Sequence, residues 1–288
     1  MASKITVVSE GNNFRGDSWV EWLSVTVFTE ATVVLSPHLW RETNVCSSYW
    51  RLYRNDADGA YVRVYDESGN RKRFDLNAGV LYLIPAWVRF DCGCDAPAVP
   101  HWYAHFGVSG LSGLISRERF AAPVTLHDIV LTNAVSHLLS TKNSDPLTAS
   151  CLTKSLLYAA LAAFLADPEQ GGYARYVARA HTLEPILPAL RRIERRFADP
   201  LTVTDLAEAC CLSREHFIRR FKIAIGDTPA HYLQTRRVEA AANRLLFSND
   251  SIDAIATDCG FSNRFYLTRV FTRDMGIAPA AYRKKGAI

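Results

Sequence analysis

Two segments in the last third of the chain repeat one pattern of apolar and polar positions about fifty residues apart. The first contains Leu206-Ala207, Cys210-Cys211-Leu212-Ser213, Phe217, Phe221-Lys222, Gly226, Pro229 and Tyr232. The second contains Ile255-Ala256, Cys259-Gly260-Phe261-Ser262, Tyr266, Phe271, Gly276, Pro279 and Tyr282. The offset is 49 residues up to the serine and 50 from Phe221 and Phe271 onward, so we expect one extra residue inside the second copy's helix. An internal repeat of this kind sets the architecture of the region.

Each copy predicts a helix-turn-helix. A short helix is expected over residues 204–209, and Ser213 or Ser262 is placed to cap the helix that follows the turn. Thr202 and Asp205 predict a capping box for the short helix. Gly260 suits a tight turn, whereas Cys211 in its place predicts a strained residue or a different turn. A connecting helix is expected over 230–247, capped by Thr228 and with Pro229 in its first turn.

The polar faces of the two later helices carry residues suited to contact with DNA. In the first copy they are Arg214, Glu215, Ile218, Arg219 and Lys222. In the second they are Asn263, Arg264, Phe265, Thr268, Arg269 and Thr272. Arginine bonds to guanine and asparagine to adenine in the major groove, and basic side chains also hold phosphates. A solvated basic face is the alternative interpretation, and the match between the two faces favours DNA.

The connecting helix has a length that suits this interpretation. Eighteen residues at about 1.5 Å each span about 27 Å, and one turn of DNA is about 34 Å. A rigid spacer of that length can present both helices to successive major grooves on one face of the DNA.

The combined pattern resembles the DNA-binding domain of the AraC/XylS family over about a hundred residues. The matching residues are Leu206-Ala207, Ser213, Phe217, Phe221-Lys222, Gly226, Pro229, Tyr232-Leu233, Arg237-Val238-Glu239-Ala240-Ala241, Leu245-Leu246, Ile252, Ile255-Ala256, Cys259-Gly260-Phe261, Arg269-Val270-Phe271, Gly276, Pro279 and Tyr282-Arg283. The resemblance implies a bacterial transcription regulator. Cys211 departs from the family's usual glycine and Thr272 from its usual lysine.

Residues 18–108 follow the period of two that is typical of strands. The runs at 19–31 and 61–65 are rich in β-branched and aromatic residues, and turn signals stand at 55–59, 67–70 and 76–79. Many short strands indicate a sandwich or a barrel. The runs Phe74-x-Leu76-x-x-Gly79-x-Leu81-Tyr82-Leu83-Ile84-Pro85 and Trp102-Tyr103-Ala104-His105-Phe106 resemble the cupin-type effector domain that often accompanies this DNA-binding domain.

The expected strands are dense in aromatic and polar side chains. The candidates for effector binding are His38, Trp40, Trp50, Tyr53, Tyr82, Trp87, His101, Tyr103 and His105. Aromatic faces with a few hydrogen-bonding groups suit a small polar ligand such as a sugar, and ordinary packing is the alternative. His101, Tyr103 and His105 share one strand face, where they can bind a metal, bind a ligand or close the end of a barrel.

The histidine set of metal-binding cupins is absent from this sequence. His38 stands alone, and the place of the last ligand falls near Phe90. We therefore expect no metal, no cofactor and no catalytic residues, which leaves a cupin enzyme tethered to DNA as a remote alternative.

After residue 112 the apolar period changes to about 3.6. It predicts a helix at 127–139, a break at Pro146 and a second helix at 148–166 with a broad apolar stripe. These helices either cover the barrel or form a dimer, and the family resemblance favours a homodimer.

The expected fold class is therefore α+β, with three parts along the chain. Residues 1–166 form a cupin-like β-barrel, followed by two helices, for effector binding and dimerisation. Residues 167–182 form a linker, since a proline and paired glycines follow the helix. Residues 183–288 form an all-α DNA-binding domain with two helix-turn-helix motifs.

Composition adds the compartment and the partners. The net charge of +4 divides into +5 for residues 181–288 and −1 for the rest, as contact with phosphates requires. With no signal peptide and no run of about 20 apolar residues, a cytoplasmic protein without membrane contact is expected. The expected partners are promoter DNA, an effector, a second copy and, for an activator, RNA polymerase.

Seven cysteines without a paired framework suit a reducing compartment. Cys92 and Cys94 leave control by thiol oxidation, or a regulator without a ligand, as alternatives.

Overall fold

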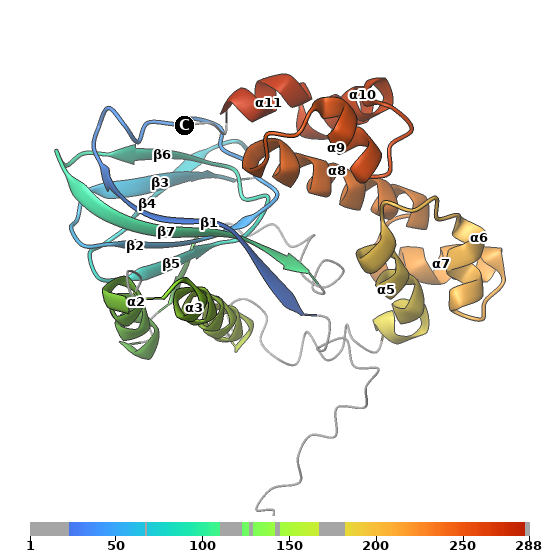
Figure 1. Ribbon diagram of the computed structural model, residues 1–288, viewed down its shortest axis with the longest axis horizontal. Coiled ribbons are helices and arrows are strands. Elements are labelled where there is room, and N and C mark those ends of the chain that lie inside the picture. The colour runs from blue at the N-terminus through green and yellow to red at the C-terminus, as the bar shows by residue number, and fades with distance from the viewer. Residues whose placement is uncertain are drawn as a thin grey trace, which may run out of the picture.

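The computed structural model describes residues 23–66, 68–109, 123–126, 129–141, 145–166 and 182–285. Within them a strand-rich N-terminal part stands beside an all-helical C-terminal part (Figure 1). The predicted linker lies outside the described residues as far as residue 181, as do the first residues of the strand predicted from 19.

The strands of the N-terminal part form two antiparallel sheets. They are β1 (Ser24–Leu35), β2 (Trp50–Asn55), β3 (Ala60–Tyr65), β4 (Arg71–Asp75), β5 (Leu81–Ile84), β6 (Phe90–Cys94), β7 (Val99–Ser109) and β8 (Val124–Leu126). One sheet has the order β1-β7-β2-β5-β8 and the other β4-β3-β6. The described strands thus form a two-sheet arrangement in place of the closed barrel that we expected. The three predicted turns all fall between strands.

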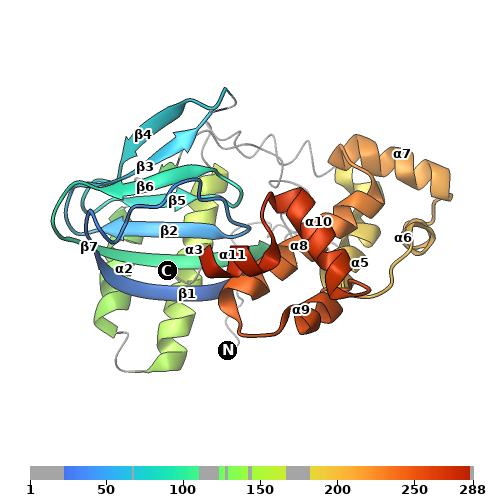
Figure 2. The same cartoon turned by 90° about the horizontal axis from the view of Figure 1, so that it is seen from above.

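Alternation along the strands gives the five-stranded sheet two different faces. Leu52 belongs to the core that also contains residues of the covering helices, whereas its neighbour Tyr53 belongs to the core that includes the second sheet. The helices α2 (Ile129–Thr141) and α3 (Pro146–Ala166) lie along the outer face (Figures 1 and 2). The inner face of the sheet carries several of the predicted effector residues, among them Tyr53, Tyr82 and Tyr103.

Two separate helices are present, as predicted, and α3 begins at Pro146, two residues before the predicted start at 148. Proline is favoured in the first turn of a helix, and the carboxylate of Asp145 accepts bonds from the backbone N–H groups of Leu147 and Thr148. By length and composition alone, this 21-residue helix with a mean hydropathy of 1.5 could cross a membrane. Its residues Leu157 and Phe164 are instead buried in the core with the sheet, as in the core helix of a soluble protein.

The C-terminal part consists of helices. They are a short 3-10 turn (Glu184–Ile186), α5 (Leu187–Arg196), α6 (Val203–Ala209), α7 (Arg214–Ile225), α8 (Pro229–Phe247), α9 (Ile252–Asp258), α10 (Arg264–Met275) and α11 (Pro279–Lys285). We call α6 with α7 the first unit and α9 with α10 the second unit. Both predicted helix-turn-helix motifs are confirmed, as are the capping box at Thr202 and the Thr228 cap of α8.

The extra residue of the second unit lies in the turn, and our placement of it inside the helix is wrong. Helix α10 is capped by Asn263, whose side chain accepts a bond of 2.9 Å from the N–H of Tyr266. Ser262 is therefore not the cap. Helices α7 and α10 are both 12 residues long and correspond at an offset of 50. The partner of Phe217 is consequently Leu267, and both side chains are fully buried.

The two parts of the protein touch where α8 ends. Phe247 stacks on Phe28 of β1, with ring centroids 4.8 Å apart, and its edge meets Tyr49. The Oγ of Ser48 donates to Oδ1 of Asn243 on α8 at 2.6 Å. In both views α8 and α11 lie beside the sheets, and the first unit lies farther away (Figures 1 and 2).

Candidate DNA interface

Helices α7 and α10 present matched polar faces. Most of the predicted DNA contacts are exposed: Arg214, Glu215, Arg219, Lys222, Asn263, Arg264, Phe265 and Arg269, with Thr272 at the end of the second face. Ile218 and Thr268 are half-buried at corresponding places. The opposite side of each helix is buried, with Phe217 and Phe221 in the first unit and Leu267 and Phe271 in the second. The buried side fixes how each helix is rotated, and so it determines which side chains face outward.

Both helices begin and end in the same way. A side-chain oxygen caps each N-terminus, from Ser213 in α7 and from Asn263 in α10. A left-handed glycine ends each helix, Gly226 with φ 79° and Gly276 with φ 71°. Oδ1 of Asn263 accepts a hydrogen bond from the backbone and is therefore occupied. The predicted contact of Asn263 with a base is left to the amide nitrogen of its side chain.

Neighbouring side chains orient the basic groups of the second face. Nη1 of Arg264 lies 3.5 Å from Oδ2 of Asp253 on α9, and its guanidinium lies over the ring of Phe265. The guanidinium of Arg269 lies 5.3 Å from the ring centre of Tyr266. The ring of Phe265 itself is 72% exposed. An exposed aromatic ring beside two arginines is chemically suited to contact both phosphates and the methyl groups of thymine.

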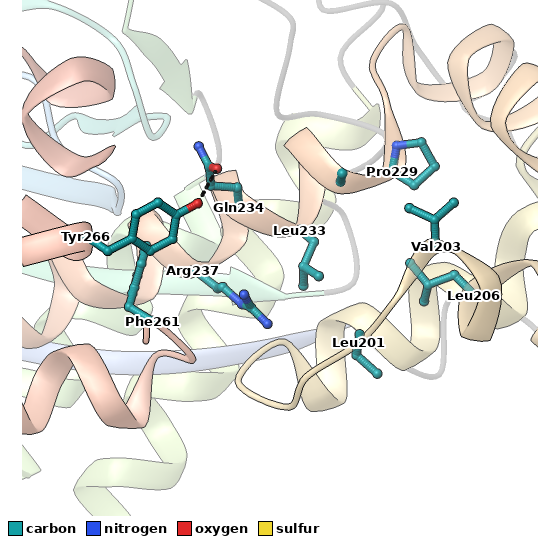
Figure 3. Close-up of a pocket in the computed structure, with 10 residues that line it drawn as sticks. Leu201, Val203, Leu206, Pro229, Leu233, Gln234, Arg237, Phe261 and Tyr266 are labelled. Carbon is teal, nitrogen blue, oxygen red and sulfur yellow. Dashed lines mark hydrogen bonds between the residues drawn. The ribbon is translucent and has the colours of Figure 1, made fainter. Parts of the chain in front are cut away.

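The two units meet at the segment 197–199, which joins α5 to the first unit. Arg237 of α8 donates from Nε to the carbonyl of Phe197 and from Nη2 to that of Asp199, both at 2.7 Å. Gly260, in the turn of the second unit, lies against the backbone of Ala198. A cavity of about 240 Å³ opens beside this contact, lined by residues of both units (Figure 3). Sequence reasoning missed the role of Arg237, because its partners lie about forty residues away.

The candidate effector residues divide into three groups. Six lie together at the space between the sheets: Trp40, Tyr53, Tyr82, His101, Tyr103 and His105. Trp50 faces the helices and contacts Phe164 of α3 edge-on, at 5.5 Å between ring centroids. His38 is exposed beyond β1, and Trp87 lies at the boundary with the C-terminal part. The structure thus brings together most, but not all, of the candidates.

We call these six side chains between the sheets the inter-sheet group. They are held by ring contacts and by a few hydrogen bonds. Nδ1 of His101 lies 2.7 Å from Oδ1 of Asn55, so the ring nitrogen donates to the amide oxygen. Burial lowers the pKa of His101 to about 3 and lowers that of His105 well below its usual value. Both rings are therefore neutral at physiological pH. Among the described residues, no group of three or more metal-binding side chains comes together.

A buried arginine lies at the end of this space that is nearest to the C-terminal part. The side chain of Arg51 is 2% exposed and donates from Nη2 to Oγ of Ser47 at 2.6 Å. Its guanidinium lies 4.3 Å from the ring centre of Tyr49. Ser47 and Tyr49 line a cavity of about 450 Å³ that residues of both parts surround. On the C-terminal side the cavity is lined by Met275 of α10, by Gly276 and Ile277, and by Tyr282 of α11.

Trp87 joins the two parts at the same place. It has a left-handed backbone, with φ 69°, which is strained for a bulky residue. Its side chain influences the carboxyl group of Glu239 on α8, whose pKa it helps to lower. Burial raises the pKa of Glu239, although the nearby charge of Arg236 opposes this shift. Trp87 therefore adds to the contacts between the N-terminal part and α8.

These features define a DNA-binding domain made of two helix-turn-helix units on a shared helix, and comparison with known proteins supports this class. Residues 206–285 match the family described as a helix-turn-helix domain. An AraC-like transcription regulator of Streptomyces lividans is 35% identical over 34% of this chain and 33% of its own length. The C-terminal part of the chain is thus an AraC-type DNA-binding domain, similar to that of AraC-like transcription regulators.

Similarity beyond the DNA-binding domain is weaker. The raffinose operon transcriptional regulatory protein RafR of Pediococcus pentosaceus is 23% identical over 91% of this chain and 94% of its own length. The crystal structure of ToxT from Vibrio cholerae covers 90% of this chain and 98% of its own, with 12% identity and a TM-score of 0.52, and shows the same fold. Three relatives matched through the DNA-binding domain alone are covered over 28 to 33% of their length.

Proposed function

We propose that this protein regulates transcription by binding promoter DNA with α7 and α10 in adjacent segments of the major groove. The observation that carries the proposal is the pair of exposed polar faces on α7 and α10, in two units that share α8. At 19 residues, α8 is about 28 Å long, close to the roughly 34 Å of one DNA turn. A shared helix of that length suits two units that contact successive openings of the major groove.

Selection of DNA from a random library by the full-length protein tests this proposal. We expect a motif with two segments, which Arg219→Ala relaxes in one segment and Arg264→Ala in the other. Each substitution should cost about 1–3 kcal/mol of binding free energy. Arg220→Ala is the matched control, since Arg220 bonds to His216 on another side of α7. Unchanged affinity and sequence preference in both test variants would refute the assignment of these faces.

The same proposal includes a small-molecule effector bound by the N-terminal part. Tyr53, His101, Tyr103 and His105 supply neutral hydrogen-bonding groups and aromatic faces, a combination that suits an uncharged polar ligand such as a sugar. A sugar is also the ligand class that the name of RafR suggests. A ligand changes DNA binding only if it favours one arrangement of the two parts over another. The contacts of Phe247 and Trp87 provide the connection that such a change requires.

A thermal-shift screen of sugars, aromatic acids and small nitrogenous metabolites tests the effector. A bound compound raises the melting temperature, because it stabilises the folded state by mass action. We expect the shift to disappear in Tyr103→Ala and to persist in His38→Ala, since His38 lies apart from the inter-sheet group. A compound that shifts both variants equally would place the site elsewhere.

Control by cysteine oxidation is less well supported. Cys92 and Cys94 are both buried, and burial raises the pKa of Cys92 to about 12. A thiol with so high a pKa holds little of the reactive thiolate. DNA affinity that responds to oxidants and to no compound of the screen would reverse this preference.

The outer side of α3 is the surface that we propose for a homodimer. Only 33% of its most apolar stretch is buried, and Leu147, Ala159 and Ala162 are exposed. Ala159→Glu or Ala162→Glu should convert a dimer into monomers in sedimentation experiments. Asn77→Glu, an equal charge change on an exposed loop, is the control. A dimer that survives both α3 variants would exclude this surface.

The proposed function also includes action in the cytoplasm and, for an activator, contact with RNA polymerase.

A further inference from the structure

We infer that Gly260 and Arg237 fix the number of base pairs between the two DNA segments, by holding the two units at one separation. The inference rests on the proposed reading of DNA by both recognition helices. It concerns positioning residues, because neither of them lies on the faces assigned to DNA.

Gly260 brings the turn of the second unit against the first unit. Its φ of +78° is a conformation that side chains disfavour, and a Cβ atom there would lie 2.5 Å from the carbonyl oxygen of Ala198. Any larger residue must therefore push the turn away from Ala198. Since α10 begins four residues after Gly260, movement of the turn moves the second recognition helix.

Arg237 holds the same short segment from the other side. Its two bonds reach the carbonyls of Phe197 and Asp199, the residues on either side of Ala198. The segment that joins α5 to the first unit is thus bound by α8 and covered by the turn of the second unit. The guanidinium has a fixed planar fork of donors, which makes this attachment directional.

The cavity beside this contact shows why these two residues matter. Leu201 and Leu206 stand on the side of the first unit and Phe261 and Tyr266 on that of the second, with about 240 Å³ between them (Figure 3). Apolar packing therefore does not fill the whole junction. Beyond the packing of each unit on α8, the units are joined directly by the tight contact at Ala198 and through the Arg237 bonds, with a long bond of 3.5 Å from Tyr266 to Gln234.

DNA converts this separation into sequence specificity. One inserted base pair moves the second segment by about 3.4 Å along the axis and turns it by about 34°. Two recognition helices at a fixed separation cannot follow that change without losing contacts. A protein with a loosened junction can adjust to it.

The experiment uses the full-length protein and the two-segment site that it selects from random DNA. Probes carry one base pair fewer, the native number, or one or two more between the segments, and further probes carry each segment alone. We expect the wild-type protein to bind the native spacing at least tenfold more tightly than its neighbours. In Gly260→Ala and Arg237→Ala this preference should fall to threefold or less, with affinity for each single segment within twofold of wild type.

Gly276→Ala is the matched control for backbone strain. Gly276 has a similar φ of +71°, but a Cβ atom there would meet nothing within 4 Å. This variant should keep the wild-type spacing preference. Arg237→Lys, which retains the charge and a single donor group, should keep part of the preference. If Gly260→Ala fails to fold, as judged by circular dichroism, the two Arg237 variants carry the test.

Three results would overturn the inference. Variants that keep the full spacing preference, or that lose affinity for single segments as much as for the whole site, would show a merely structural role. A wild-type protein that binds all spacings alike would likewise remove it. Selection of a motif with only one segment is a different outcome, because it would overturn the proposed two-segment function itself.

Discussion

The recognition helices α7 and α10 share their length, their type of cap and their terminal glycine, yet their outward faces differ. The first unit presents Glu215 and Lys222 where the second presents Phe265 and Thr272. The turns differ too, since the first bends at Cys211, with φ 53°, and the second at Gly260 and is one residue longer. A repeated backbone can therefore carry two different chemistries, and we expect the units to make unequal contributions to binding.

The units also differ in what holds them to α8. Arg236 of α8 lies buried between Glu194 of α5 and Glu239, and Tyr232 donates to Glu194 at 3.1 Å. This network binds the side of the first unit. The second unit relies on an apolar core and on Arg283, which donates to the carbonyls of Leu245 and Asp250.

The largest effect that we expect comes from the buried network. Arg236→Ala leaves two carboxylates without their cation and should cost about 3–5 kcal/mol of unfolding free energy. Arg283→Ala, its counterpart in the second unit, should cost about 1–2 kcal/mol, because its carbonyl partners are neutral. Urea unfolding of both variants measures the difference. Equal losses would mean that the two units are attached with similar strength.

Phe265 tests the apolar character of the second face. Phe265→Ala should weaken DNA binding by about 1–2 kcal/mol and relax a preference for thymine in one segment only. Glu215→Ala, at the corresponding position of the first unit, should leave that segment's affinity for thymine unchanged. Quantitative binding to single-base variants of the selected site measures both effects. A relaxed preference in both segments after either substitution would contradict the assignment.

The salt dependence of DNA binding should distinguish the role of Lys222 from that of Thr272. Lys222→Ala should reduce the slope of log affinity against log salt by about 1, through the loss of one phosphate contact. Thr272→Lys should increase the slope by about 1, since it restores a basic group at the matching position of α10. Thr272→Ala is the control and should leave the slope as it is. If Lys222→Ala leaves the slope unchanged, this residue does not contact a phosphate.

The smallest effect concerns the turn of the first unit. Cys211→Gly should stabilise the protein by about 0.5–1 kcal/mol, because glycine tolerates the left-handed backbone better than cysteine. Thermal unfolding measures the gain, with the exposed Cys151→Gly in α3 as a contrasting variant that should destabilise. A loss of stability in Cys211→Gly would mean that the cysteine side chain makes a compensating contact.

The repeat allowed both units and most of their outward faces to be predicted from sequence, because local apolar spacing determines which side of a helix is buried. The cap of α10 was misplaced, since Ser262 and Asn263 are both good caps and local pattern does not distinguish them. The face of the sheet on which Trp50 lies depends on the phase of its strand. The flanking residues do not determine that phase. The contact of Phe28 with Phe247 joins positions far apart in the chain, and no local signal marks it.

Helix α8 has one further consequence, for the way in which the DNA-binding domain opens and refolds. Its first half supplies Tyr232 and Leu233 to the core around the first unit, and its second half supplies Val238, Ala241 and Leu245 to that of the second. Neither core is complete without this helix. The slowest amide protons of both units should therefore exchange with solvent in a single cooperative opening, with one shared free energy.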